Sequence, residues 1–203
     1  MGAWLSTRRK IGIFGGTFDP PHNAHLQLAQ MVLTELKLDS LYFIPASYHP
    51  LKRNADLTPA EIRYEMIKAA VKSNKSFKVS RIEIDRPSIS YTVDTLKMFR
   101  AYENIEHSLL YYIMGVDNLK DIQKWKNPQE IFNLANVVIL NRPGFNEQAI
   151  SENYQNKVIQ LDLPRYDISS TMIRKAIQHH EYVLDLVPTE VYQIIRKYHL
   201  YQT

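Results

Sequence analysis

Residues 15–25 read Gly-Gly-Thr-Phe-Asp-Pro-Pro-His-Asn-Ala-His and directly follow the apolar run Ile11–Phe14. The apolar run has the composition of a short buried strand. The glycine pair lets the backbone turn tightly and approach a ligand, and the two prolines stiffen the loop before a helix expected from Asn23 to about Lys37. The stretch therefore predicts a strand, a turn and a helix at the start of the fold.

The rest of the chain repeats this alternation. Further strands are expected at Leu41–Ile44, Phe77–Ile84, Leu109–Met114, Val137–Asn141 and Val158–Leu161. Helix starts with an N-cap and a first-turn proline are expected at Thr58 and Asn127, and a terminal helix is expected to open at Val187-Pro188. Another helix start is expected within Asp167–Arg174, with hydroxyls at its N-terminus, Ser169 among them. The order predicts the α/β class: a Rossmann-like, doubly wound parallel sheet with flanking helices in a single domain. In such a sheet, ligands bind beyond the carboxyl ends of the strands.

Composition narrows the classes of function. The chain has 203 residues, a formal net charge of +4 and no cysteine. Its length suits one domain, which we place at residues 11–203 after a basic tail at residues 1–10. Disulfides, thiolate metal sites and thiol nucleophiles are excluded, and no window approaches the roughly 18 apolar residues of a membrane span. We expect a cytoplasmic protein with anionic ligands and no membrane partner; a homo-oligomer stays open.

His22 and His25 stand three positions apart at the expected helix start. They project from one face, where free amides and the positive end of the helix favour a phosphate. One alternative is an ordinary turn with two solvated histidines. Another is a zinc site, for which no third ligand stands nearby. Neither GxxxxGK[ST] nor GxGxxG occurs, so the pattern indicates a phosphate site of another kind.

The stretch GGTFDPPHNAH closely resembles the signature of nucleotidyltransferases that carry a histidine-x-x-histidine element on a Rossmann-like fold. Residues 168–174, ISSTMIR, are similar to the second signature of the same proteins. Between them, HPLK at His49–Lys52, SYTVDTL at Ser90–Leu96, GVDNLKDIQKW at Gly115–Trp125 and VVILNRPG at Val137–Gly144 resemble one branch, the bacterial nicotinate-nucleotide adenylyltransferases. HPLK departs from that branch's usual Pro-Pro-His-Lys/Arg order.

The resemblance implies transfer of the adenylyl group of ATP to nicotinate mononucleotide, with Mg²⁺ accompanying ATP and no metal held by the protein. It implies catalytic roles for His22, His25 and Arg174. It implies ATP contacts from Gly15, Gly16, Thr17, Phe18, Gly115, Asp117, Ile168, Ser169, Ser170 and Thr171. It implies nicotinate mononucleotide contacts from Lys52, Tyr91, Thr92, Trp125 and Arg142.

Several alternatives stay open at this point. Ser169 can be a plain helix cap with Arg174 solvated, and Trp125 can be a helix residue between two lysines. Within the superfamily, the acceptor can instead be nicotinamide mononucleotide, phosphopantetheine or a flavin, or the reaction can be cytidylyl transfer. A nucleic-acid-binding module is disfavoured, because 25 basic residues barely exceed 21 acidic ones and no basic and aromatic stripe is present.

Overall fold

Six parallel strands form the centre of the molecule in the order β3-β2-β1-β4-β5-β6. The computed structural model describes residues 8–47, 57–86, 89–102, 108–119, 121–141, 154, 156–164 and 166–202, with the backbone alone at Asp117 and Leu119. The strands are β1 Lys10–Gly16, β2 Ser40–Pro45, β3 Phe77–Val79, β4 Leu109–Gly115, β5 Asn136–Asn141 and β6 Val158–Asp162. The predicted doubly wound parallel sheet is confirmed.

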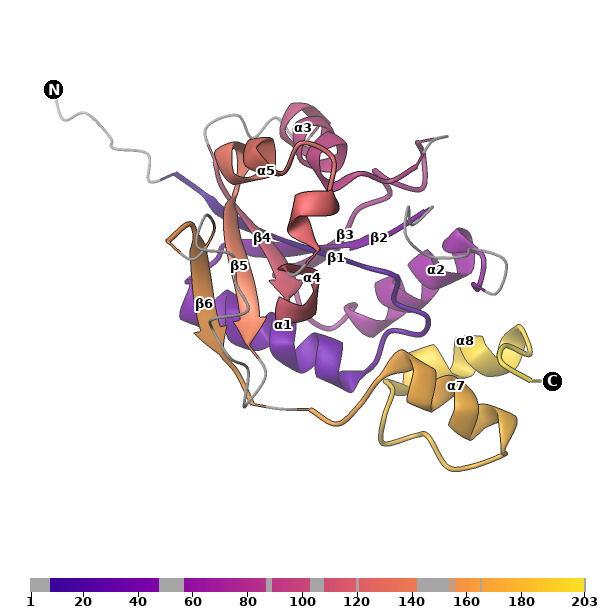
Figure 1. Ribbon diagram of the computed structural model, residues 1–203. Coiled ribbons are helices and arrows are strands. Elements are labelled where there is room, and N and C mark those ends of the chain that lie inside the picture. Colours follow the sequence, from indigo (N-terminus) through magenta and orange to yellow (C-terminus); the bar gives the residue numbers. More distant parts are fainter. Residues whose placement is uncertain are drawn as a thin grey trace, which may run out of the picture.

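Helices cover both faces of this sheet (Figure 1). They are α1 Asn23–Glu35, α2 Ala60–Ala70, α3 Thr92–Tyr102, α4 Val116–Leu119, the 3₁₀ helix η2 Ile122–Lys124, α5 Pro128–Leu134, α7 Ser170–Gln178 and α8 Thr189–Lys197. Helices α3 and α5 lie over one face, and α1 and α2 lie under the other. Helices α7 and α8 pack beside α2 at the edge of the molecule. None of the helices in the described part of the chain is both long and apolar enough to cross a membrane.

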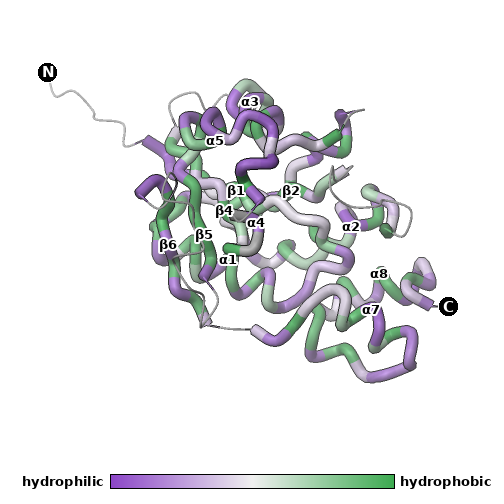
Figure 2. Tube along the Cα trace, in the orientation of Figure 1, coloured by the Kyte–Doolittle hydropathy of each residue, from purple (hydrophilic) through white to green (hydrophobic). Residues whose placement is uncertain are grey.

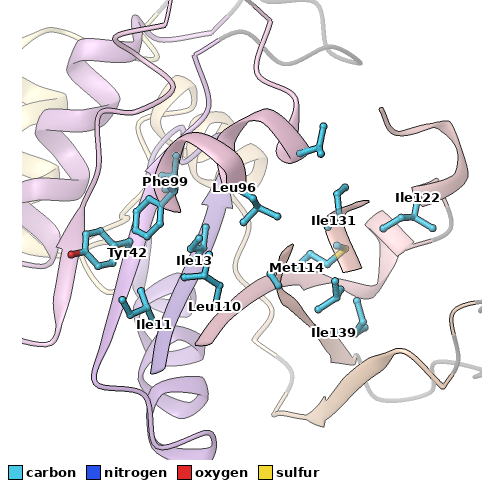
Figure 3. Packing of buried hydrophobic residues seen from close by; sticks show 14 of the residues in the cluster. Ile11, Ile13, Tyr42, Leu96, Phe99, Leu110, Met114, Ile122, Ile131 and Ile139 are labelled. Carbon is cyan, nitrogen blue, oxygen red and sulfur yellow. The ribbon is translucent and has the colours of Figure 1, made fainter. Parts of the chain in front are cut away.

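Both faces of the strands are apolar because each face is covered by helices. Ile11 and Ile13 of β1 pack with Leu96 and Phe99 of α3 on one face (Figure 3). Phe14 of the same strand belongs to the cluster on the opposite face, with residues of α1 and α2. The hydropathy trace shows the same arrangement, with apolar strands inside and more polar stretches on the outer helices (Figure 2).

Some predicted boundaries are wrong, and each has a local cause. Strand β3 ends at Val79 instead of residue 84, because the chain turns there: the N–H of Asp85 donates to the carbonyl of Arg81. Helix α1 ends at Glu35, because Lys37 has a φ of 51°, which no right-handed helix accommodates.

One predicted N-cap is also wrong, and a second holds its position without the side-chain bond of a cap. At α2, Pro59 takes the cap position and the hydroxyl of Thr58 contacts the hydroxyl of Tyr201 instead. At α5, Asn127 makes no side-chain cap bond and has a left-handed backbone, with a φ of 46°. Both helices nevertheless begin within two residues of the predicted start.

The order of the strands reverses between β1 and β4. The chain runs from β1 outward to β2 and β3 on one side, and from β4 outward to β5 and β6 on the other. At such a reversal the connections leave in opposite directions, which opens a crevice beyond the carboxyl ends of the two strands. Gly15 and Gly16 end β1 there, and Gly115 ends β4.

Candidate active site

Two cavities meet at the crevice between β1 and β4. The first has a volume of about 700 Å³ and is lined by the histidine pair, the start of α7 and the end of β5. The second has a volume of about 420 Å³ and is lined by the start of α3 and the segment from η2 to Lys126. Gly15 and Gly16 line both cavities. Ligands in the two cavities can therefore meet over the glycine pair.

His22 and His25 lie at the start of α1 and line the first cavity. Their rings stack with centroids 3.6 Å apart and planes inclined by 24°. The backbone N–H of His22 donates to Nδ1 of His25 over 3.2 Å. Because an accepting nitrogen of a neutral imidazole carries no proton, the proton of His25 is on Nε2, which is then a hydrogen-bond donor.

Burial keeps both imidazoles neutral. It lowers the pKa of His22 to about 4, and burial together with the neighbouring His22 lowers the pKa of His25 well below its ordinary value. His22 is 5% exposed, and its Nδ1 has no hydrogen-bond partner among the described residues. A buried polar atom of this kind in a native protein is explained by a catalytic role, an ion or a water. The pair is suited to hydrogen-bond a ligand without a standing positive charge.

Phe18 packs against the ring of His25. Its ring meets that of His25 edge-on at 5.0 Å between centroids, and it lies 5.7 Å from the rings of both Phe14 and Phe43. Phe18 has a φ of 52°, a left-handed conformation that costs a non-glycine residue about 1–2 kcal/mol. A Cβ at Gly16 would lie 2.8 Å from Cζ of Phe18. Gly16 is therefore required because the Phe18 ring occupies the space of a side chain.

The amides at the start of α1 differ from the expectation of a free phosphate cradle. The N–H of Asn23 donates to the carbonyl of Leu186, and that of His25 to the carbonyl of His22, both over 2.9 Å. The N–H of His22 is held by the His25 ring. Three of the first amides are thus already paired within the protein, and the two imidazoles are the side-chain donors that the start of α1 presents to the cavity.

The start of α7 contributes Ile168, Ser169 and Ser170 to the first cavity. The hydroxyl oxygen of Ser169 accepts the N–H of Met172 over 3.2 Å, which confirms the predicted cap. The hydroxyl of Ser170 donates to the carbonyl of Pro20 over 2.9 Å. Helix α7 is therefore fastened to residues 17–22, which we call the histidine loop.

Arg174 and Thr171 are not among the described residues that line the two cavities. Nη1 of Arg174 donates to the carbonyl of Asp19 over 2.7 Å, and Nη2 donates to the hydroxyl of Thr171 over 3.4 Å. In this structure the guanidinium supports the histidine loop. Its contact with a leaving group stays a prediction.

Gly115 lines the first cavity. A Cβ at this position would meet no atom within 4 Å, so packing does not demand a glycine here. Open space above a glycine backbone permits close approach of a ligand. The neighbouring wall contains residues that the sequence analysis did not single out: Leu28, Leu140, Asn141, Pro164 and Tyr166. Asn141 stands at the carboxyl end of β5. Because ligands bind beyond the carboxyl ends of parallel strands, this position could have identified Asn141 as a site residue from the sequence.

The second cavity gathers Tyr91, Thr92 and Trp125, three of the predicted contacts of the mononucleotide. Trp125 directly follows η2 and meets the ring of Tyr112 edge-on, with centroids 6.4 Å apart. The hydroxyl of Tyr112 lies 3.3 Å from the hydroxyl of Thr92, at the first residue of α3. Trp125 therefore presents an indole face beside a helix N-terminus, a pairing that suits a flat anionic ring.

Charged side chains of the second cavity were not predicted. Glu83 is buried, its pKa is raised by burial, and it accepts the hydroxyl of Thr95 over 2.7 Å. Lys126 pairs with Asp94 over 2.8 Å and lies 5.0 Å from the centroid of the Tyr91 ring. The pair of Lys126 with Asp94 joins the segment carrying Trp125 to α3. Glu83 fell within the predicted strand Phe77–Ile84, where a single charged residue gave no signal of a role in the site.

The remaining predicted contacts divide into two groups. Thr17 lines the second cavity rather than the first. Lys52 and Arg142 lie outside the described residues, as does the side chain of Asp117. Among the residues that are described, no three His, Asp or Glu side chains gather as metal ligands.

Comparison with known proteins gives the family. A family model described as Cytidylyltransferase-like matches residues 13–176. A protein of Clostridium acetobutylicum named "Probable nicotinate-nucleotide adenylyltransferase" is 41% identical over 201 residues, which are 95% of this chain and 99% of the relative. A protein of Clostridium tetani with the same name is 42% identical over 202 residues, which are 96% of this chain and 100% of the relative.

A solved structure supports the fold. Nicotinic acid mononucleotide adenylyltransferase of Plasmodium falciparum, complexed with NaAD, is similar with a TM-score of 0.76 at 20% identity, over 96% of this chain and 98% of that chain. The Clostridium proteins match this chain at twice that identity and almost from end to end. With the paired histidines at the reversal of the sheet, these matches show that the chain belongs to the nicotinate-nucleotide adenylyltransferase family.

Proposed function

We propose that this chain transfers the adenylyl group of ATP to nicotinate mononucleotide, giving nicotinate adenine dinucleotide and pyrophosphate. The observation that carries the proposal is the meeting of two cavities at Gly15 and Gly16. One cavity offers donors for phosphates, and the other offers an indole face and a helix N-terminus for a pyridine carboxylate. A reaction that joins two nucleotides needs two such sites with one shared wall.

The reaction is an in-line attack of the mononucleotide phosphate on the α-phosphorus of ATP. A new P–O bond forms, the bond between the α-phosphorus and the bridging oxygen breaks, and its electron pair leaves with pyrophosphate. The attacking phosphate is already ionised at neutral pH, so no strong general base is required. Catalysis then rests on alignment and on stabilising the charge that develops on the phosphate oxygens.

Nε2–H of His25 is the donor best defined by the geometry, because Nδ1 of the same ring is occupied. His22 stacks on it and shares the cavity. We assign both rings to oxygens of the α- and β-phosphates. The capped start of α7, with Ser169 and Ser170, is assigned to the departing pyrophosphate.

Mg²⁺ enters in this proposal as part of the substrate MgATP. Its ligands would be phosphate oxygens and waters, as is usual when Mg²⁺ accompanies a nucleoside triphosphate. We propose that the enzyme acts in the cytoplasm, because its substrate is ATP and a chain without cysteine needs no oxidising compartment for disulfides.

The test is pyrophosphate release from MgATP with a panel of phosphorylated acceptors. We expect the highest kcat/KM with nicotinate mononucleotide, a lower value with the amide, and none with phosphopantetheine. A preference for nicotinamide mononucleotide, or turnover of CTP in place of ATP, would contradict the proposal.

A further inference from the structure

Asp19 is a buried carboxylate that the proposed reaction does not use. It lies in the histidine loop, three residues before His22, is 1% exposed, and lines neither cavity. A buried carboxylate is costly unless hydrogen bonds and nearby charges compensate it. Its partners therefore indicate why the chain keeps a carboxylate there.

Both oxygens of Asp19 accept hydrogen bonds from distant segments. The hydroxyl of Tyr201 donates to Oδ1 over 2.5 Å, across 182 positions of sequence. The N–H of Thr58, just before α2, donates to Oδ2 over 3.2 Å. The hydroxyl of Thr58 in turn lies 3.3 Å from that of Tyr201. Burial and the Asp19 carboxylate raise the pKa of Tyr201, so its hydroxyl stays a donor at any ordinary pH.

The backbone around Asp19 is held from other directions. Arg174 donates to its carbonyl over 2.7 Å, and Ser170 donates to the carbonyl of Pro20 over 2.9 Å. Arg63 donates to the carbonyl of Thr17 over 2.7 Å. No regular ladder of helix or strand orders these residues, so side chains from α2, α7 and the segment after α8 determine the path of the histidine loop.

We propose that Tyr201 is a positioning residue for the histidine pair and acts through the carboxylate of Asp19. The inference rests on the proposed function. Without the Tyr201 hydroxyl, Oδ1 of Asp19 loses a buried partner, and the carboxylate must turn toward another donor. The loop would follow, and with it the rings of His22 and His25. Displacement of a catalytic group by about 1 Å typically costs up to about 10²-fold in rate.

The test compares Tyr201→Phe with the matched control Tyr198→Phe. Tyr198 also makes a hydroxyl bond to α2, over 2.9 Å to Glu65, but it contacts no residue of the histidine loop in the described structure. We expect kcat to fall about tenfold or more in Y201F with KM for both substrates within about twofold, and kcat to stay at the wild-type value in Y198F. A merely stabilising role would lower the melting temperature and leave kcat of the folded enzyme unchanged.

A second readout does not depend on turnover. The ¹H–¹⁵N imidazole resonances of His22 and His25 should move in Y201F and stay in place in Y198F. If Y201F does not fold, Thr58→Val, which removes the neighbouring hydroxyl and keeps the Thr58 N–H bond, should move the same resonances in the same direction by less. Unmoved resonances together with wild-type kcat in Y201F would overturn the inference. Failure of the proposed function would instead appear as an inactive wild-type enzyme, and the resonances would still decide the role of Tyr201.

Discussion

His22 combines burial, stacking on His25 and a ring nitrogen without a protein partner. We expect His22→Ala to lower kcat by about 10²-fold or more, because loss of one preorganised donor at a developing charge has that effect. Steady-state kinetics of the folded variant provides the measurement. His179→Ala, which alters an exposed histidine at the end of α7, is the control and should keep wild-type kcat. Normal turnover of H22A would reject the catalytic role.

Two glycines of the site have different reasons to be glycine. Gly115→Ala adds a methyl group that meets no protein atom, so we expect unfolding free energy within about 0.5 kcal/mol of wild type and a raised KM for ATP. Gly16→Ala forces the Phe18 ring to shift and should cost about 1–3 kcal/mol of stability. Urea unfolding and ATP titration separate the two effects. Equal loss of stability in both variants would contradict this distinction.

At the scale of elements, Ser169 has two separable roles, as the cap of α7 and as part of the first cavity. Ser169→Ala should cost about 1 kcal/mol of stability by removing the cap. Ser169→Asp keeps a good cap but places a negative charge where we assign pyrophosphate. We therefore expect wild-type stability and a strongly raised KM for ATP in the aspartate variant. Unchanged ATP affinity in S169D would place the phosphates elsewhere.

Local sequence determined some elements and not others. The cap at Ser169 was predictable because donor and acceptor lie three residues apart in the chain. Thr58 carries the same signal, yet its hydroxyl contacts Tyr201, a partner 143 positions away that no local pattern reveals. The spacing of His22 and His25 likewise indicated a shared site, and the bond that fixes the His25 tautomer is also local, because its donor lies three residues earlier in the chain. The predicted cap at Thr58 failed because a tertiary contact replaced a local one.

At the scale of the whole molecule, Arg63 connects segments that form the crevice. It is 1% exposed and donates to the carbonyls of Thr17, Ala46 and Thr58 over 2.7–2.8 Å. Arg63→Met leaves three carbonyls without this donor and should cost about 3 kcal/mol or more of unfolding free energy. The control is Arg81→Met, which breaks exposed ion pairs with Glu61 and Asp85 and should cost less than about 1 kcal/mol. Urea unfolding of both variants checks the difference; similar losses would show that Arg63 does not join these segments.

Acid stability of the whole fold follows from the lowered pKa of His22. The unfolded chain binds a proton at this residue below about pH 6.5, whereas the folded protein does so only near pH 4. The contribution of neutral His22 to the free energy of unfolding is therefore fully present above about pH 6.5 and falls as the pH decreases toward 4. By pH 5 this residue alone lowers the free energy of unfolding by about 2 kcal/mol. His22→Gln should reduce that loss when unfolding free energies are compared at pH 7.5 and pH 5. An identical pH dependence in both proteins would show that His22 is not buried neutral.

The wall of Gly15 and Gly16 that both cavities share has a consequence for release. A dinucleotide product occupies both cavities at once. When one nucleotide of the product detaches, the other nucleotide is still bound and keeps the detached one near its cavity. Such bivalent attachment lengthens residence beyond that of either mononucleotide. We therefore expect the dinucleotide to dissociate more slowly than either mononucleotide and to inhibit competitively against both substrates.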